Sequence, residues 1–167
     1  MTPRTDKLYL VGFMGSGKTT VARALGRRLG WRAIDLDDEI ERREGRSVSQ
    51  VFAQHGEAYF RQVEREILVT FLPLRNVVIA TGGGTFVQPV NRADILADGL
   101  SVWLDVPFAR IVDRVPSDGR RPLAADREAF AALFAERRAA YRQAHVRLDA
   151  SGRIDTIVER LFHKHGW

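Results

Sequence analysis

The sequence predicts an α/β fold in which a parallel β-sheet is covered by helices on both faces. Short apolar runs alternate with helical segments along the chain, which is typical of repeated βαβ units. Val77–Ala80 is a continuous apolar run that is mostly β-branched, as expected of a strand that is buried on both faces. With 167 residues, of which 45% are hydrophobic, the chain suits one core. We therefore expect a single domain over residues 1–167.

The elements are recognised from apolar runs, helical periodicity and residues that cap or break helices. Strands are expected at the short apolar runs, which are residues 8–11, 31–36, 77–80, 101–105 and 145–148. Helices are expected at about 20–29, 37–44, 48–54, 57–72, 89–97, 107–115, 127–144 and 155–164. Their limits are marked by breaking or capping residues, which include Gly30, Gly45, Ser47, Gly56 and Pro73. Residues 1–6 are expected to be a disordered lead-in.

The first strand runs directly into a glycine loop and a helix. Residues 12–19 of this loop read G-x-x-x-x-G-K-T. Its glycines allow the backbone amides to turn inward, and these amides form an anion site with the helix N-terminus. A plain turn is the alternative, but it leaves the lysine and the hydroxyl unexplained. We expect Lys18 to reach the β- and γ-phosphates, and Thr19 to hold Mg²⁺. The predicted triphosphate site comprises Gly15, Ser16, Gly17, Lys18, Thr19 and Thr20.

Two acidic residues follow the second strand, at the edge of the sheet where ligands gather. Asp35 and Asp37 are two residues apart, so they share a side if the chain is extended. The buried strand at 77–80 ends in Thr81 and glycines, and therefore offers no acid for the metal. We expect Asp35 to assist Mg²⁺ through water, and Asp37 to orient or deprotonate a substrate hydroxyl. The alternative is that both acids cap the helix that follows.

Two further segments carry residues suited to an anionic substrate. The run Gly82–Gly84 allows backbone amides to approach a ligand closely, with a tight turn as the alternative. Arg61 precedes Glu64 by three residues on one helix. This spacing either holds the arginine in one rotamer for a carboxylate or makes an ordinary solvated ion pair. The spacing alone leaves both readings open.

The polar, turn-rich loop at residues 116–124 is an expected cover of the site. It carries Arg120 and Arg121, whose charges can balance a γ-phosphate during its transfer. An ordinary surface loop is the alternative. The four histidines show no metal-ligand spacing, and we expect them to be structural or exposed. The dinucleotide pattern G-x-G-x-x-G is absent, which argues against an oxidoreductase.

Composition excludes several classes of protein. The sequence has no cysteine, so it contains neither disulfides nor thiolate metal sites. It shows no leader and no apolar stretch of about 18 residues, so we expect a cytoplasmic protein without a membrane partner. The formal charge of +5 would suit nucleic acid, but acids interleave with the arginines, as in residues 39–46. We expect no nucleic-acid partner.

Together these motifs resemble those of shikimate kinases over about residues 7–153. The matching segments are Gly12–Thr19, Asp35–Asp37, Phe60–Glu64, Gly82–Gly84, Arg121–Leu123 and the pair Arg137 and Tyr141. The resemblance implies the P-loop nucleoside monophosphate kinase fold, with a five-stranded parallel sheet in the order 2-3-1-4-5. It also implies a substrate-binding segment at about 36–64 and a lid at about 116–126. The implied reaction is ATP-dependent, Mg²⁺-assisted phosphorylation of the 3-hydroxyl of shikimate, and we expect a monomer.

The resemblance also implies roles for residues on the substrate side. Asp37 would contact ring hydroxyls and help to position or deprotonate the nucleophile. Arg61 and Arg137 would bind the carboxylate, while Gly83 and Gly84 would offer backbone contacts.

On the nucleotide side, the resemblance implies that Arg121 closes on the transferring phosphate together with Lys18. Arg114 matches the arginine that stacks on adenine, and Arg153 lies in the expected adenine loop. This loop, at residues 150–155, lacks the proline that the family often has there.

Two alternatives share part of the pattern. A gluconate kinase would have the phosphate loop and the lid, but the F-R-x-x-E segment at 60–64 and the G-G-G segment at 82–84 are less expected there together. A nucleotide-dependent nucleic-acid-binding or switch protein would account for the charge of +5.

Overall fold

Five short apolar runs pair as parallel strands in a computed structural model, which describes residues 5–114 and 126–165. The strands are β1 (Lys7–Val11), β2 (Arg32–Asp35), β3 (Val77–Ala80), β4 (Leu100–Asp105) and β5 (Val146–Asp149). Their order in the sheet is β2-β3-β1-β4-β5, and every neighbouring pair is parallel. The predicted fold class and strand order are therefore confirmed.

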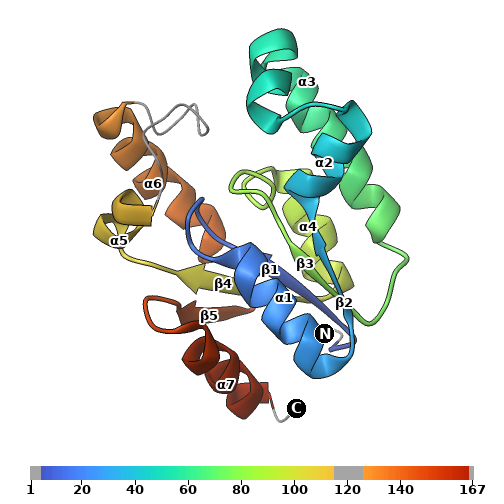
Figure 1. Ribbon diagram of the computed structural model, residues 1–167, viewed down its shortest axis with the longest axis vertical. Coiled ribbons are helices and arrows are strands. Elements are labelled where there is room, and N and C mark those ends of the chain that lie inside the picture. The colour runs from blue at the N-terminus through green and yellow to red at the C-terminus, as the bar shows by residue number, and fades with distance from the viewer. Residues whose placement is uncertain (1–4, 115–125, 166–167) are drawn as a thin grey trace.

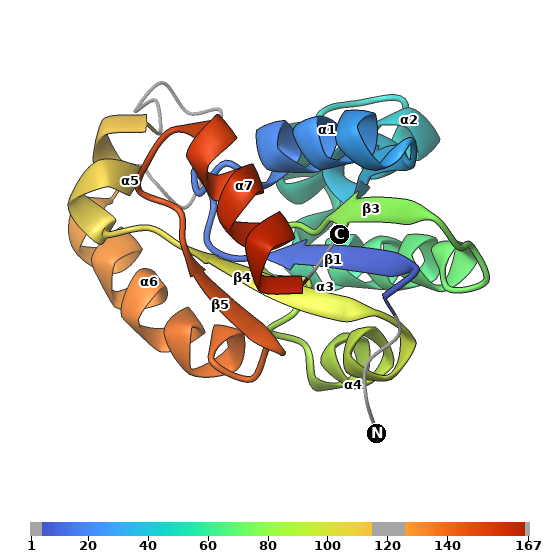
Figure 2. The ribbon, with the colours of Figure 1, turned by 90° about the horizontal axis from the view of Figure 1, so that it is seen from below.

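Helices connect the strands and cover both faces of the sheet. They are α1 (Lys18–Leu29), α2 (Leu36–Glu44), α3 (Val48–Phe71), α4 (Pro89–Asp98), α5 (Phe108–Arg114), α6 (Arg127–Tyr141) and α7 (Ile154–His165). Figure 1 shows α2 and α3 on the side of β2, and α5 and α6 on the side of β5. Figure 2 shows α1 and α7 on one face of the sheet, with α4 and α6 on the other. The strands β1 and β3 are consequently buried along their whole length.

Some boundaries differ from those predicted, for local reasons. α2 begins at Leu36, which the sequence analysis placed in a strand, because the Asp35 side chain caps the first turn of this helix. α6 ends at Tyr141, three residues earlier than predicted. The segments expected on either side of Gly56 form one kinked helix, α3, in which Gly56 has φ 82° and ψ 176°. This residue therefore interrupts the helix, as predicted, without ending it.

The pairing register brings three loops to one edge of the sheet. Ala80 pairs with Leu10 of β1 and with Asp35 of β2, so the three strands end together. Thr81 fixes this edge, because its amide and its hydroxyl both donate to the Leu10 carbonyl, at 3.1 and 2.9 Å. The phosphate loop, the start of α2 and the glycine turn after β3 therefore lie side by side.

Several predictions fall on residues that the structure does not describe. These are residues 1–4 of the lead-in and the cover loop, including Arg120 and Arg121. The last two lead-in residues are described, and the expected disorder does not extend to Asp6, whose carbonyl accepts a hydrogen bond from the Asn76 amide at 2.6 Å. In residues 5–114 and 126–165, no helix combines the length and the apolar character needed to cross a membrane.

Candidate active site

A cavity of about 1140 Å³ opens at the carboxyl ends of the strands. Its walls come from the loop after β1, from α2 and α3, from the turn after β3, and from α6 and the segment before α7. All described residues that the sequence predicts for the site line it, namely Gly15, Ser16, Gly17, Lys18, Thr19, Thr20, Asp35, Asp37, Arg61, Gly83, Gly84, Arg114, Arg137 and Arg153. The cavity thus collects both predicted subsites in one space.

The phosphate loop is shaped by glycines in backbone conformations that other residues rarely adopt. Gly12, Gly15 and Gly17 have φ values of 148°, 78° and 90°. Gly17 is the N-cap of α1, so the first-turn amides of this helix open into the cavity. The Lys18 ammonium donates to the carbonyls of Gly12 at 2.7 Å and Phe13 at 3.0 Å. These carbonyl contacts hold the charge over the loop, where an anion can replace them.

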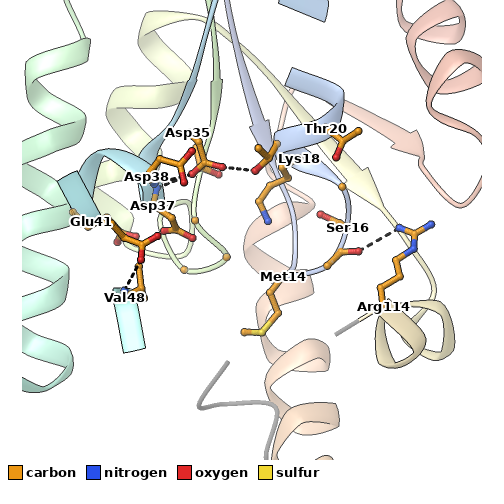
Figure 3. A pocket seen from close by; sticks show the side chains of 18 of the residues that line it. Met14, Ser16, Lys18, Thr20, Asp35, Asp37, Asp38, Glu41, Val48 and Arg114 are labelled. Atoms are coloured by element: carbon orange, nitrogen blue, oxygen red, sulfur yellow. Dashed lines mark hydrogen bonds between the residues drawn. The ribbon is translucent and has the colours of Figure 1, made fainter. Parts of the chain in front are cut away.

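Two arginines flank the phosphate loop from the far side of the cavity. Arg114, at the end of α5, donates from Nη1 to the Gly15 carbonyl at 3.2 Å. Arg153 lines the cavity from the segment before α7. Figure 3 shows the Lys18 amino group directed into the space between Asp35 and Asp37 on one side and Arg114 on the other.

Asp35 connects the phosphate loop to α2 through its two carboxylate oxygens. Oδ2 accepts a hydrogen bond from the Thr19 hydroxyl, while Oδ1 accepts from the amides of Asp37 at 2.8 Å and Asp38 at 3.2 Å. Asp35 is therefore at once a helix cap and a hydrogen-bond partner of Thr19, the predicted metal ligand. The expectation that Asp35 and Asp37 share a side of an extended chain is wrong, because the helix begins at Leu36. Burial and the charge of Asp35 raise the pKa of Asp38.

The glycine turn after β3 makes room for side chains from three helices. Its glycines, all within the described residues, adopt no positive φ. A Cβ on Gly82 would lie 2.9 Å from Asp37 Oδ1, and one on Gly83 would lie 3.1 Å from Arg137 Nη1. A Cβ on Gly84 would lie 2.5 Å from Arg61 Nη1 and 2.6 Å from its Cζ. Glycine is needed here because neighbouring side chains occupy the space of a Cβ.

The ion pair between Arg61 and Glu64 belongs to the interior. Glu64 has a fully buried side chain, and Arg61 is 16% exposed. Nη1 of the arginine donates to both carboxylate oxygens, at 3.0 and 3.3 Å. The solvated pair that the spacing left open is therefore excluded, and the guanidinium is held against Gly84.

A second guanidinium reaches the same turn from α6. Arg137 is only 6% exposed. Burial lowers its pKa, and the positive charge of Arg61 lowers it further. Tyr141, one helical turn later, donates from its hydroxyl to the Gly83 carbonyl, and burial raises the pKa of this phenol. Two cations from separate helices thus converge on one buried turn, which favours an anionic ligand there.

Sequence reasoning missed two parts of the site. Val48 and Phe52 on α3 line the cavity, and Phe52 packs on Phe60 with ring centroids 4.5 Å apart. Their spacing of four residues was a usable signal for a shared helix face. Thr85 was also missed; its hydroxyl donates to Glu64 Oε2, and no sequence pattern marks it.

Comparison with known proteins identifies the family of this chain. The family model for shikimate kinase matches residues 14–165. A shikimate kinase of Persephonella marina is 40% identical over 160 residues, which cover 92% of this chain and 98% of the relative.

Solved structures lead to the same family. The crystal structure of shikimate kinase from Aquifex aeolicus has a TM-score of 0.88 at 35% identity, covering 96% of each chain. Shikimate kinase from Acinetobacter baumannii in complex with shikimate has a TM-score of 0.91 at 32% identity, covering 98% of this chain and 95% of the other. The predicted resemblance to shikimate kinases is therefore confirmed, and the chain belongs to the shikimate kinase family.

Proposed function

We propose that this chain transfers the γ-phosphoryl group of ATP to the 3-hydroxyl of shikimate, releasing ADP and shikimate 3-phosphate. The observation that carries the proposal is the convergence of Arg61, Arg137 and Asp37 on one glycine turn, in the same cavity as the phosphate loop. Two guanidiniums suit a carboxylate, and an adjacent acid suits a hydroxyl. Membership of the family and the relative in complex with shikimate support this choice of substrate.

The side chains act mainly by positioning and by compensating charge. The loop amides and Lys18 hold the triphosphate, while Arg61 and Arg137 hold the carboxylate at the other end of the cavity. Asp37 orients the hydroxyl and accepts its proton as the oxygen bonds to the γ-phosphorus. The bond from this phosphorus to the β–γ bridging oxygen breaks, and ADP carries the electron pair away. Phe52 adds an apolar surface to the cavity wall. Exclusion of water from the closed site would keep water from competing as the nucleophile.

Mg²⁺ is the cation that the nucleotide side accommodates best. The Thr19 hydroxyl and the Asp35 carboxylate meet there, and such hard oxygen ligands suit this ion. Among residues 5–114 and 126–165, no cluster of three or more His, Cys, Asp or Glu could hold a metal. Mg²⁺ would therefore be bound by Thr19, by Asp35 through water, and by phosphate oxygens. When bound, it neutralises charge on the phosphates.

The remaining features are proposed on the same basis. Arg121, on a lid at about 116–126, would add positive charge at the transferring phosphate, as phosphoryl transfer requires. Arg114 and Arg153 would contact the adenosine part of ATP, next to the loop that they flank. We propose that residues 1–167 act as a single kinase domain, as a monomer in the cytoplasm, without nucleic-acid or membrane partners.

A coupled ADP-release assay, run with and without shikimate, tests the proposal. We expect ADP release to depend on shikimate, with gluconate giving no more than the background. Replacing Arg61 or Arg137 by lysine should raise the KM for shikimate and leave that for ATP unchanged, because lysine loses the bidentate contact. Equal increases in both constants would refute the carboxylate assignment. Salt-sensitive retention of oligonucleotides on filters would favour the nucleic-acid alternative instead.

A further inference from the structure

A buried hydroxyl links the glycine turn to the ion pair of Arg61. Thr85 is fully buried at the end of this turn. Its Oγ1 accepts a hydrogen bond from the Gly82 amide at 2.9 Å and lies 2.9 Å from Glu64 Oε2. A hydroxyl has a single proton, and the amide can only donate, so the proton of Thr85 is directed to the Glu64 carboxylate.

The resulting chain of hydrogen bonds ends at the guanidinium group. Glu64 Oε2 accepts from Thr85, and both oxygens of Glu64 accept from Arg61 Nη1. The guanidinium is packed against Gly84, the residue directly before Thr85. One turn thus provides both the space for the arginine and an anchor for the carboxylate that orients it.

We propose that Thr85 is a positioning residue for the substrate carboxylate, acting on Arg61 through Glu64. The inference rests on the proposed function, in which Arg61 binds the carboxylate of shikimate. Without the hydroxyl, the buried Gly82 amide loses its acceptor and Glu64 loses one of its donors. The contact of Arg61 with Gly84 then loosens.

Replacing Thr85 by valine tests this role, since valine keeps the branched shape and removes the hydroxyl. We expect the KM for shikimate to rise roughly tenfold, with kcat within about threefold and the KM for ATP unchanged. Thr85→Ser restores the hydroxyl and should return the KM for shikimate close to the wild-type value. Thr85→Ala serves as a second variant if valine prevents folding.

A matched control separates this effect from the loss of any threonine hydroxyl. Thr70 lies on the same helix as Arg61, and its hydroxyl donates to the Ile67 carbonyl at 2.6 Å. Thr70→Val should change neither Michaelis constant. A double-mutant cycle provides a second control: in an Arg61→Ala background, Thr85→Val should change kcat/KM for shikimate by less than about twofold.

The outcomes separate this inference from the proposed function. An inactive wild-type protein would overturn the proposed function. If the wild type is active and Thr85→Val leaves the KM for shikimate unchanged, only the role of Thr85 is overturned. The same holds if Thr85→Ser fails to restore the KM, or if Thr85→Val has an undiminished effect in the Arg61→Ala background. A crystal structure of Thr85→Val without substrate tests the geometry independently. We expect the Arg61 guanidinium to leave Gly84, and an unmoved guanidinium would refute the role.

Discussion

Two glycine-rich segments line the same cavity, yet they need glycine for different reasons. At Gly17 in the phosphate loop, φ is 90° and a Cβ would meet no described atom within 4 Å. At Gly84 in the turn after β3, φ is not positive, but a Cβ would lie 2.5 Å from Arg61 Nη1. Gly17 is needed for its backbone conformation, whereas Gly84 is needed because it leaves room for the Arg61 side chain from α3. Substitutions in the two segments should therefore fail in different ways.

The largest effect is expected from Lys18, the charged residue of the phosphate loop. Lys18→Met removes the ammonium held over the Gly12 and Phe13 carbonyls and keeps a side chain of similar length. Turnover should fall by roughly a thousandfold, because a preorganised charge at the phosphates is lost. The coupled assay measures this loss, and circular dichroism checks that the fold is intact. Turnover near the wild-type level would remove the phosphate loop from the mechanism.

The next effect is expected at the acid that packs on the glycine turn. Asp37→Asn should reduce kcat by roughly a hundredfold, since an amide orients a hydroxyl but accepts no proton. The melting temperature should change little, because Asp35 rather than Asp37 supplies the cap of α2. Kinetics and thermal unfolding of the same sample test both points. A lower melting temperature with normal turnover would show that Asp37 is structural.

A methyl group on the glycine turn should act on the shikimate side alone. Gly84→Ala should raise the KM for shikimate roughly tenfold, because the added Cβ displaces the Arg61 guanidinium. The free energy of unfolding should also fall, by about 1–3 kcal/mol, because moving the guanidinium weakens its hydrogen bonds to the buried Glu64 carboxylate. Gly83→Ala should have a smaller effect, because its Cβ would lie 3.1 Å from Arg137 Nη1. The comparison breaks down if Gly84→Ala unfolds the protein or weakens ATP binding equally.

The smallest effect is expected from the backbone conformation of the phosphate loop at Gly17. Gly17→Ala meets open space but must adopt a left-handed φ, so it should destabilise the fold by about 1–2 kcal/mol. Gly30→Ala is the matched control, because Gly30 has φ 69° and open space at the other end of α1. Both variants should lose similar stability in urea unfolding, while only Gly17→Ala should raise the KM for ATP. A raised KM for shikimate in either variant would contradict this division.

The fold was largely predictable because its signals are local. Alternating apolar and helical segments indicate a parallel sheet. The strand order was implied by the resemblance to shikimate kinases, and it is confirmed. α2 begins one residue earlier than predicted, because Asp35 caps it, a role that the sequence offered only as an alternative for the two acids. The end of α6 at Tyr141 was missed, since its last predicted turn lacks a breaking residue.

The site was predictable as a set of residues, but its contacts were not. All described candidates line one cavity, whereas their roles stay predictions. The spacing of Arg61 and Glu64 fits a solvated pair as well as a buried one, and only packing decides between them. The reason for three successive glycines lies in side chains from α2, α3 and α6. Such contacts depend on the tertiary arrangement, which no local pattern records.

Asp35 couples the nucleotide side of the cavity to the side that carries Asp37. One of its oxygens holds the Thr19 hydroxyl, and the other holds the first turn of the helix that carries Asp37. A cation that binds next to Thr19 therefore interacts with the same carboxylate that fixes the first turn of α2 and hence the position of Asp37. If nucleotide binding changes the affinity for shikimate by some factor, shikimate binding must change the affinity for the nucleotide by the same factor, because such linkage is reciprocal.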